Sequence, residues 1–553
     1  QGGTRLPPIA GDLLPLTLAP YGWYWLDILR PDDERARAET VVDERRHALP
    51  DLLVSERWDT VFDGPARAVL ERRYLLPYLE RQPWYRAPGT RVRAVRIVSH
   101  ALARGGDEPV VLLAVDVEGE VDTYRYGLVL TFAAGARGEE LLDRHPDRVL
   151  ARIGGARVGT LHEVIESEAA RVLMRMLTDG TRLAGHGGVF DAASRGAAVL
   201  ADHEPYTEVP TTLGQTVVAC GAAAELKFRR RLLPGRSHEQ RLLAALADDL
   251  DVELPVVYAS LDLLTPDGRR WPFVLLRSRV PHTEDGWERS RHLALRWLAE
   301  PHPFEDTPDP LAWLRDGRDA PRLESEPLQD VERMTRAMGH RVAATHIAIA
   351  AAQSSADVHR PDGEEPRLSR DRELAEAALV ALDDLPEAVR SRWATVMSTP
   401  AAQHLLASRQ ILGALARWRW TDDVPSPVDP DDSTPGAGGT AGDCGDRDIA
   451  ALAADLAYAA LDALESSAPA YEQQVPAARA WWAIATWGLI RGWQEQLAAA
   501  GHACSPVDEL VARLRAGLLW RLIVDATSAS TTRRAQARRM LGDLAARPVG
   551  DAG

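Results

Sequence analysis

The chain contains almost no lysine and no asparagine. Lys227 is the one lysine among its 65 basic residues, and asparagine is absent from all 553 positions. A lysine ammonium is a compact point charge and an arginine guanidinium is a planar fork, so the two are not interchangeable where a ligand is bound. The lone lysine is therefore the first candidate for a functional residue, the alternative being a surface lysine retained by chance. Any role that asparagine usually has must fall to another residue type.

Cysteines and long hydrophobic runs are also scarce. Cys220, Cys444 and Cys504 are an odd number without the spacing of a zinc site, which favours a reducing, cytoplasmic setting. No stretch of about 18 apolar residues occurs, so we expect no membrane span. The chain starts at Gln1 without a signal-like segment, and we expect it to be a fragment of a longer protein.

Positive charge is in deficit. The net charge of −16 argues against nucleic acid as a partner, because phosphate backbones need a basic face. The arginines at 229–231 are too few to change this, and we interpret them as the solvated end of a strand. With 45% hydrophobic and 26% charged residues the chain is expected to be soluble and globular, and its length allows three or more domains.

Lys227 lies in a pattern typical of a half-buried strand. Residues 216–228 (TVVACGAAAELKF) are interpreted as two strands joined at Cys220 and Gly221. In the second strand, Glu225 and Lys227 alternate with apolar neighbours, so Lys227 would project beneath the hairpin. Kinase-like folds hold the α- and β-phosphates of ATP with a lysine in this position. The pattern therefore predicts a nucleotide site.

Other segments alternate between helix and strand patterns. Strands are expected at 13–28, 92–102, 109–119, 123–132, 254–264 and 269–280, and helices at 55–85, 140–159, 161–178 and 238–249. Almost everything beyond Asp285 is expected to be helical, including residues 331–351. The sequence therefore predicts strands in its first half and helices in its second half.

Four motifs together resemble the maltokinase family. The chain has RQPWY at 81–85, LKFRRRLLPG at 226–235, PHTEDGWE at 281–288 and GHRVAATHIAIA at 339–350. Maltokinases have a helix ending in Arg-x-Trp-Phe, a strand ending in Lys-Leu-Phe-Arg-Arg, a segment like PNxGDGWE and a Gly-Arg-x-Thr-Ala-Glu-Leu-His helix. The resemblance covers about residues 50–553.

The resemblance implies an α+β, bilobal, protein-kinase-like fold. Residues 50–205 would form the N-terminal cap of the family, residues 206–300 the small β-rich lobe and residues 301–553 the helical large lobe. The Pro-, Gly- and acid-rich residues 421–446 are expected to be a mobile loop. Residues 1–32 are similar to the last two strands of the β-domain of a trehalose synthase, which implies a trehalose synthase domain as partner.

The activity implied by this resemblance is phosphorylation of maltose at its anomeric hydroxyl with ATP and Mg²⁺ as cofactors, and glucosamine is an open alternative substrate. Lys227 falls on the nucleotide-binding lysine of the family. The family's partner glutamate is replaced by Arg241, and Glu239 lies two residues earlier, which on a helix turns the side chain by about 200°. Glu239 is our candidate for the second nucleotide-site residue, while the partner of the lysine stays open.

The catalytic motif of the family is missing. In the His-Gly-Asp motif of maltokinases, the aspartate accepts the proton of the sugar hydroxyl, and no His-Gly-Asp occurs here. Aligned without gaps, Leu405 stands at the position of this aspartate, while Gln410 and Asp422 fall on the positions that hold Mg²⁺. Since leucine accepts no proton, no catalytic residue is assigned.

Two functions follow from the resemblance, and a third stays open. The first is a weakened kinase for maltose or a similar sugar, because a general base contributes about 10²–10⁴ in rate and its loss leaves positioning and charge neutralisation. The second is a catalytically dead pseudokinase that binds nucleotide or supports the trehalose synthase domain. The third, a plain glycan-binding module, would need no lysine on a hairpin.

Aromatic residues of the helical half have two interpretations. Trp481, Trp482, Trp487 and Trp493 lie on one expected helix and suit a sugar site, but core packing is favoured for most of them. His346 occupies the histidine position of the family and is expected to be a buried structural residue.

Overall fold

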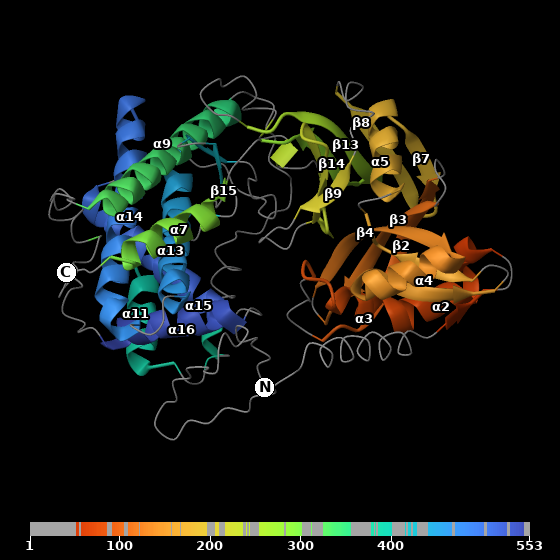
Figure 1. Ribbon diagram of the computed structural model, residues 1–553, viewed down its shortest axis with the longest axis horizontal. Coiled ribbons are helices and arrows are strands. Elements are labelled where there is room, and N and C mark those ends of the chain that lie inside the picture. The colour runs from red at the N-terminus through yellow and green to blue at the C-terminus, as the bar shows by residue number, and fades with distance from the viewer. Residues whose placement is uncertain are drawn as a thin grey trace, which may run out of the picture.

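The computed structural model of the chain describes most of residues 51–546. The described ranges are 51–54, 57–85, 91–103, 109–120, 122–155, 158–165, 168–195, 205–209, 216–235, 239–240, 243, 254–280, 284–300, 311, 325–354, 376, 378–380, 382, 385–400, 415, 418–421, 424–427, 441–466, 471–502, 506–527 and 531–546. The strands and helices before residue 280 and those after residue 284 gather on opposite sides of the molecule (Figure 1). The trehalose-synthase-like segment 1–32 lies outside the described residues.

The first β-sheet has seven strands in the order β1-β5-β6-β4-β3-β2, with β12 paired to β4. These strands are β1 (Asp51–Leu53), β2 (Ala94–Ala103), β3 (Val110–Glu118), β4 (Thr123–Ala134), β5 (Val149–Gly154), β6 (Gly159–His162) and β12 (Arg231–Leu232). The helices of this region are η1 (Trp58–Phe62), α2 (Gly64–Val69), η2 (Leu70–Tyr74), α3 (Leu75–Glu80), α4 (Gly135–Arg144) and η3 (Pro146–Arg148). β2, β3 and β4 confirm three expected strands.

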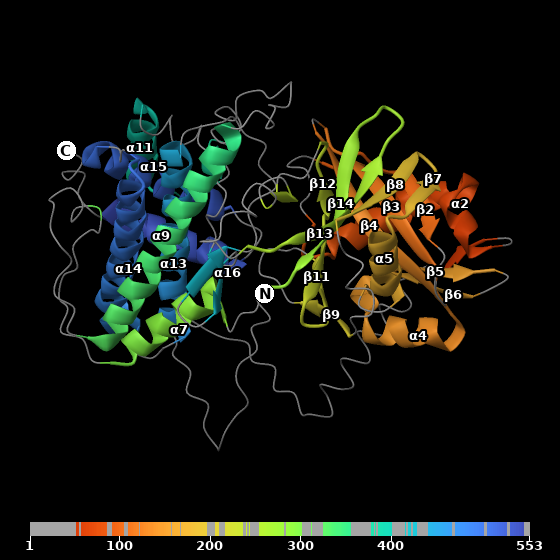
Figure 2. The same cartoon turned by 90° about the horizontal axis from the view of Figure 1, so that it is seen from above.

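The second sheet also has seven strands, in the order β7-β8-β13-β14-β11-β10-β9. They are β7 (Arg182–Gly185), β8 (Gly188–Ser194), β9 (Tyr206–Val209), β10 (Thr216–Cys220), β11 (Ala224–Phe228), β13 (Val257–Leu264) and β14 (Arg270–Ser278). The expected hairpin is confirmed, because β10 and β11 pair antiparallel after a turn in which Gly221 has φ 60°. Helix α5 (Glu168–Asp179) packs against β8 and β13 of this sheet and against β3 and β4 of the first (Figure 2).

One expected helix, at residues 140–159, is wrong. Helix α4 ends at Arg144, and β5 and β6 occupy most of the remainder. The strand residues Val149, Leu150 and Ile153 are at most 1% exposed because β5 lies between β1 and β6. Pairing and burial on a sheet outweigh the modest helix preference of such a segment.

The helical part consists of α7 (Gly286–Leu298), α9 (Glu326–Ser354), α11 (Glu387–Met397), α13 (Ala441–Ser466), α14 (Tyr471–Ala499), α15 (Val507–Asp525) and α16 (Thr531–Ala546). Helix α9 lies along α14 with glycines at the crossing. A Cβ at Gly339 would lie 2.1 Å from the Leu489 carbonyl oxygen, and one at Gly492 would lie 2.0 Å from the Arg336 carbonyl oxygen. The two backbones can approach this closely only because both positions lack a side chain.

Part of the expected loop at 421–446 is regular structure, which corrects that expectation. A small sheet forms in the order β15-β16-β17 from β15 (Glu284–Asp285), β16 (Trp418–Thr421) and β17 (Val424–Pro427), and α13 begins at Ala441. Trp418 and Trp420 are fully buried and anchor β16 to the helical core, so burial decides the structure here and composition does not. Residues 428–440 lie outside the described residues.

The two large sheets exchange elements across the expected domain boundary at residue 205. β7 and β8 precede that residue and belong to the second sheet, whereas β12 follows it and pairs with β4 of the first sheet. The division into cap and small lobe therefore stays a prediction. None of the helices in the described ranges is long and apolar enough to cross a membrane.

Candidate functional site

Lys227 lies in the middle of the second sheet. Its strand β11 pairs with β10 on one side and with β14 on the other, which places Lys227 opposite Val217 and Leu275. Side chains alternate between the two faces of a strand, so Glu225, Lys227 and Arg229 share one face. Lys227 is 1% exposed, which is unusual for a lysine without a charged partner.

Glu239 supplies that partner. Lys227 Nζ lies 3.0 Å from Glu239 Oε2, and the Glu239 side chain is fully buried. Arg229 donates to the same oxygen, and Arg277 Nη1 lies 2.5 Å from the other oxygen, Oε1. The structure thus brings together the two residues expected at the nucleotide site and settles that Glu239 pairs with Lys227, which the helical offset had left open.

Arg277 connects this carboxylate to a second one. It lies directly opposite Glu225 in the pairing of β14 with β11, and its Nε and Nη2 atoms are 2.7 and 2.6 Å from Glu225 Oε1. The sequence analysis missed Arg277, because its position beside β11 depends on a strand pairing between segments about 50 residues apart. We name the five side chains Glu225, Lys227, Arg229, Glu239 and Arg277 the Glu239 cluster.

The strand order gives the Glu239 cluster its place in the fold. Five neighbouring strands follow the order β9-β10-β11-β14-β13, and Lys227 is on the third of them counted along the chain from β9. Glu239 comes next along the chain, in helical residues 239–240, before β13 begins. In protein kinases, the lysine of the third strand pairs with a glutamate of the following helix. The topology and the ion pair therefore agree on a kinase-type arrangement.

The remaining expected site residues lie outside the described residues: Leu405, Gln410 and Asp422. Their assignment to the base position and to Mg²⁺ stays a prediction. In the described ranges, no group of three or more His, Cys, Asp and Glu side chains is placed to hold a metal ion. β16 pairs with β15, so Glu284 and Asp285 of the motif PHTEDGWE lie beside the Trp418–Thr421 strand.

The interpretation of residues 229–231 as a solvated strand end is wrong for two of the three arginines. Arg229 has an 11% exposed side chain and contacts Glu239, and Arg230 has a 5% exposed side chain. Only Arg231 is exposed, with its guanidinium carbon 3.9 Å from the ring centroid of Tyr124. The overlooked signal is the alternation of side chains along a strand. Continued beyond Phe228, it places Arg229 on the same face as Lys227 and Arg230 on the opposite face.

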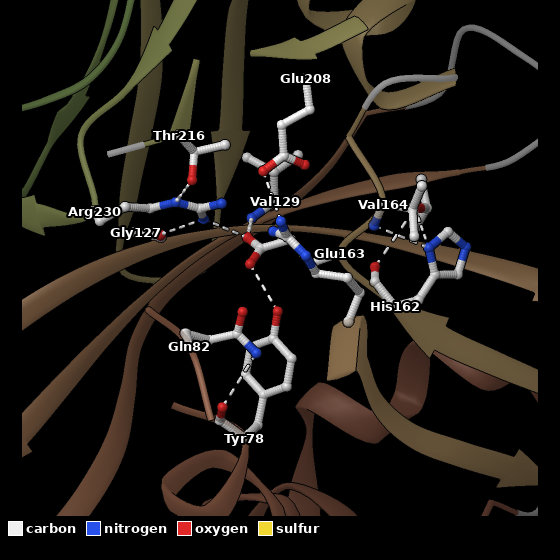
Figure 3. A network of polar contacts seen from close by, with 12 residues as sticks. Tyr78, Gln82, Gly127, Val129, His162, Glu163, Val164, Glu208, Thr216 and Arg230 are labelled. Atoms are coloured by element: carbon white, nitrogen blue, oxygen red, sulfur yellow. Dashed lines mark hydrogen bonds and ion pairs between the residues drawn. The ribbon is translucent and has the colours of Figure 1, made fainter. Parts of the chain in front are cut away.

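Arg230 enters a buried polar network between the two sheets (Figure 3). Its Nη1 atom lies 2.6 Å from Glu163 Oε1, and its Nε donates to Thr216 Oγ1 at 2.9 Å. Glu163 is fully buried and also accepts hydrogen bonds from the Tyr78 hydroxyl at 2.8 Å and from the Val129 backbone N–H at 2.7 Å. Because these groups come from both sheets, the network fixes the end of β11 against the first sheet.

Burial determines the protonation of two members of this region. Burial raises the pKa of Tyr78 well above its ordinary value, so its hydroxyl remains a donor to Glu163. Burial lowers the pKa of His162 to about 3. The Val164 backbone N–H donates to His162 Nδ1 at 3.2 Å, so this nitrogen is an acceptor and the ring is neutral.

The aromatic and histidine residues of the helical part are structural, as expected. Trp481 and Trp493 are at most 1% exposed and Trp487 is 8% exposed, all within the core of this part. Trp482 is half-buried and donates its indole N–H to the Ala453 carbonyl oxygen at 2.9 Å. His346 is fully buried, with Nε2 2.8 Å from Asp448 Oδ2, and this pair joins α9 to α13.

Comparison with solved structures gives the fold. A structure named "Glucosamine kinase (crystal form B)" aligns with 88% of this chain and 99% of its own length, at 18% identity and a TM-score of 0.50. Another, "Glucosamine kinase in complex with glucosamine, ADP and inorganic phosphate", covers 89% of this chain and 100% of its own, at 16% identity and a TM-score of 0.49. No protein-family model and no curated protein matches the chain.

The first of these alignments, at this low identity, shows the fold alone. The chain has an α+β, bilobal, kinase-like fold, and the expected fold class is confirmed. The narrower resemblance to maltokinases, and the fusion to a trehalose synthase, stay predictions.

Proposed function

We propose that the chain is an ATP-dependent sugar kinase, weakened by the loss of its general base. The observation that carries this proposal is the buried Lys227–Glu239 pair at 3.0 Å, in the strand and helix order of a kinase-type small lobe. A plain glycan-binding module would need no lysine held in that place. The kinase-like fold supports the same class of reaction.

Phosphoryl transfer depends mainly on positioning and on neutralising phosphate charge. The reaction breaks the bond between the γ-phosphorus and the bridging oxygen of ADP, forms a bond to a sugar oxygen, and releases the proton of the sugar hydroxyl. The Lys227 ammonium would hold the phosphate oxygens, and Glu239 would hold the ammonium. Gln410 and Asp422 would hold Mg²⁺. Leu405 cannot accept the hydroxyl proton, which would pass instead to solvent water.

Two sugars are candidates for the acceptor. The motifs at 81–85, 226–235, 281–288 and 339–350 favour maltose, with maltose 1-phosphate as product. The names of the similar solved structures favour glucosamine. Both carry hydroxyl groups that can accept a phosphoryl group, so the class of acceptor is a sugar in either case.

A second candidate function is a pseudokinase, which is favoured by Leu405 at the base position. It would bind nucleotide without transferring phosphate, or it would support the trehalose synthase domain implied by residues 1–32.

The deciding experiment incubates the purified chain with Mg·ATP and either maltose or glucosamine, and measures sugar phosphate and bound nucleotide. A working kinase yields product that disappears in Lys227→Met and in Asp422→Ala. Bound Mg·ATP without product, lost in Lys227→Met, identifies the pseudokinase. Absence of nucleotide binding by the unaltered chain would refute both functions.

A further inference from the structure

The buried carboxylate of Glu239 has more cationic partners than a lysine–glutamate pair requires. Its oxygen Oε2 accepts from Lys227 and Arg229, and its oxygen Oε1 accepts from Arg277 at 2.5 Å. Protein kinases rely on one lysine for this contact. Here two arginines reach the same carboxylate from the sheet.

The two arginines hold Glu239 from separate positions. Arg229 follows β11, two residues beyond Lys227, whereas Arg277 is on β14 and also bridges to Glu225 through Nε and Nη2. The Arg277 side chain is 4% exposed and that of Arg229 is 11% exposed. A guanidinium has five N–H donors in a fixed plane, so Arg277 can bind two carboxylates at once, which an ammonium does with less geometric definition.

This arrangement changes the consequence of moving the lysine. A fully buried carboxylate that loses its sole cation is left with an uncompensated charge, which is strongly destabilising. If Lys227 were the sole cation at Glu239, moving its ammonium to a phosphate would leave the buried carboxylate without a cation, and this cost would oppose the contact with the phosphate. With Arg229 and Arg277 in place, Glu239 keeps two cations after Lys227 turns away.

The charges of the Glu239 cluster favour an anion beside it. Three of the five side chains are cations and two, Glu225 and Glu239, are anions. Within these five side chains cations therefore exceed anions by one, and such an excess favours an anionic ligand such as a phosphate.

We infer that Arg277 and Arg229 are positioning residues that hold Glu239 independently of Lys227, which frees the Lys227 ammonium for a nucleotide phosphate. This inference rests on the proposed nucleotide site. It adds that the glutamate stays in place whether or not the lysine contacts it. The substitutions that dislodge Glu239 are therefore at the arginines and not at the lysine.

The test compares four variants of the whole chain, with Mg·ADP as the probe: Arg277→Gln, Arg229→Gln, Lys227→Met and Arg270→Gln. Arg270 is the matched control, because it is also on β14 and also pairs at 2.5 Å with a buried carboxylate, that of Asp262. The dissociation constant of Mg·ADP and the melting temperature are measured for each variant. Where sugar phosphate is formed, the KM values for ATP and for the sugar are measured as well.

We expect Arg277→Gln to weaken Mg·ADP binding by roughly 10- to 100-fold, the loss that is typical at metal sites when a residue that orients a binding group is replaced. Arg229→Gln changes affinity in the same direction by less, because that side chain is more exposed. Arg270→Gln leaves affinity unchanged. The KM for ATP rises in the first two variants and the KM for the sugar does not, whereas a general loss of folded protein would lower kcat and leave both KM values unchanged.

The melting temperatures test the independent hold on Glu239. We expect Lys227→Met to lower the melting temperature by less than half as much as Arg277→Gln. An equal or larger loss in Lys227→Met would overturn the inference, and so would wild-type affinity for Mg·ADP in a folded Arg277→Gln or Arg229→Gln variant. If the unaltered chain binds no Mg·ADP, the proposed function and the inference fall together, which distinguishes that failure from the failure of the inference alone.

Discussion

Replacement of Glu163 by glutamine tests whether the polar network between the two sheets contributes to stability. Glu163 is fully buried and receives Arg230 at 2.6 Å, the Tyr78 hydroxyl at 2.8 Å and the Val129 N–H at 2.7 Å. Glutamine keeps the shape but removes the charge, which leaves the buried Arg230 guanidinium without its carboxylate. Removing one partner of a buried ion pair costs about 3–5 kcal/mol.

The assay is urea or thermal unfolding followed by tryptophan fluorescence. For a domain of 150–250 residues, each kcal/mol shifts the melting temperature by about 2–4 °C, so Glu163→Gln should lower it by roughly 6–20 °C. A matched control is Glu208→Gln, because Glu208 pairs with Arg148 at the same 2.6 Å but is 28% exposed.

Exposed ion pairs contribute about 1 kcal/mol or less, so we expect the partly buried Arg148–Glu208 pair to cost less than the fully buried Arg230–Glu163 pair. Equal destabilisation by Glu163→Gln and Glu208→Gln would refute the reasoning, because burial would then have no bearing on the cost. The double variant Glu163→Gln with Arg230→Met removes both charges, and we expect it to be more stable than Glu163→Gln alone. If the loss of unfolding free energy in the double variant equals the sum of the losses in Glu163→Gln and Arg230→Met, the two residues are not coupled.

Three further predictions concern pH and packing. The pKa of His162 is lowered to about 3, so the ring stays neutral in the folded protein, whereas in the unfolded chain it protonates below about pH 6.5. The stability contributed by the neutral ring is therefore full above about pH 6.5 and falls as the pH drops toward about 3. Denaturant unfolding across this range should give a flatter pH profile of stability for His162→Leu, and an unchanged profile would contradict the assignment. The raised pKa of Tyr78 has the opposite consequence: the stability contributed by its protonated hydroxyl is present below about pH 10 and is lost as the pH rises above it. In an alkaline unfolding series, Tyr78→Phe should therefore lose less unfolding free energy above about pH 10 than the unaltered chain. Gly492→Ala places a Cβ 2.0 Å from the Arg336 carbonyl oxygen and should lower the unfolding free energy by about 1–3 kcal/mol. Gly542→Ala places its Cβ on the exposed face of α16 with nothing within 4 Å, and it should raise the unfolding free energy by up to about 1 kcal/mol. A change of the same sign in both variants, measured by denaturant unfolding, would refute the packing argument.

The sequence alone predicted the strands whose pattern is local. The hairpin around Gly221 and the strands β2, β3, β4, β13 and β14 were expected because alternation or apolar runs mark them within a few residues. The segment 140–159 was assigned wrongly, because its strand β5 exists through its pairing with β1 and β6, which no short window contains.

The candidate site divides in the same way. Lys227 was found from its rarity and from its strand pattern, both visible in the sequence. Its contact with Glu239 stayed open, because Glu239 is two residues away from the family's glutamate position. Whether its side chain reaches Lys227 depends on how the helical residues lie against the sheet, and the sequence does not give this. Arg277 was missed because β13 and the helical residues separate it from β11 along the chain, and only the register of β14 brings it opposite Glu225.

The single lysine also gives the chain one side-chain amine that can react with acylating reagents. The unprotonated amine of a lysine attacks acylating reagents, and Lys227, the one lysine, is 1% exposed and ion-paired. Acylation of Lys227 therefore requires an opening that exposes the Glu239 cluster. The rate at which one acyl group is added at this position would measure how often that region opens.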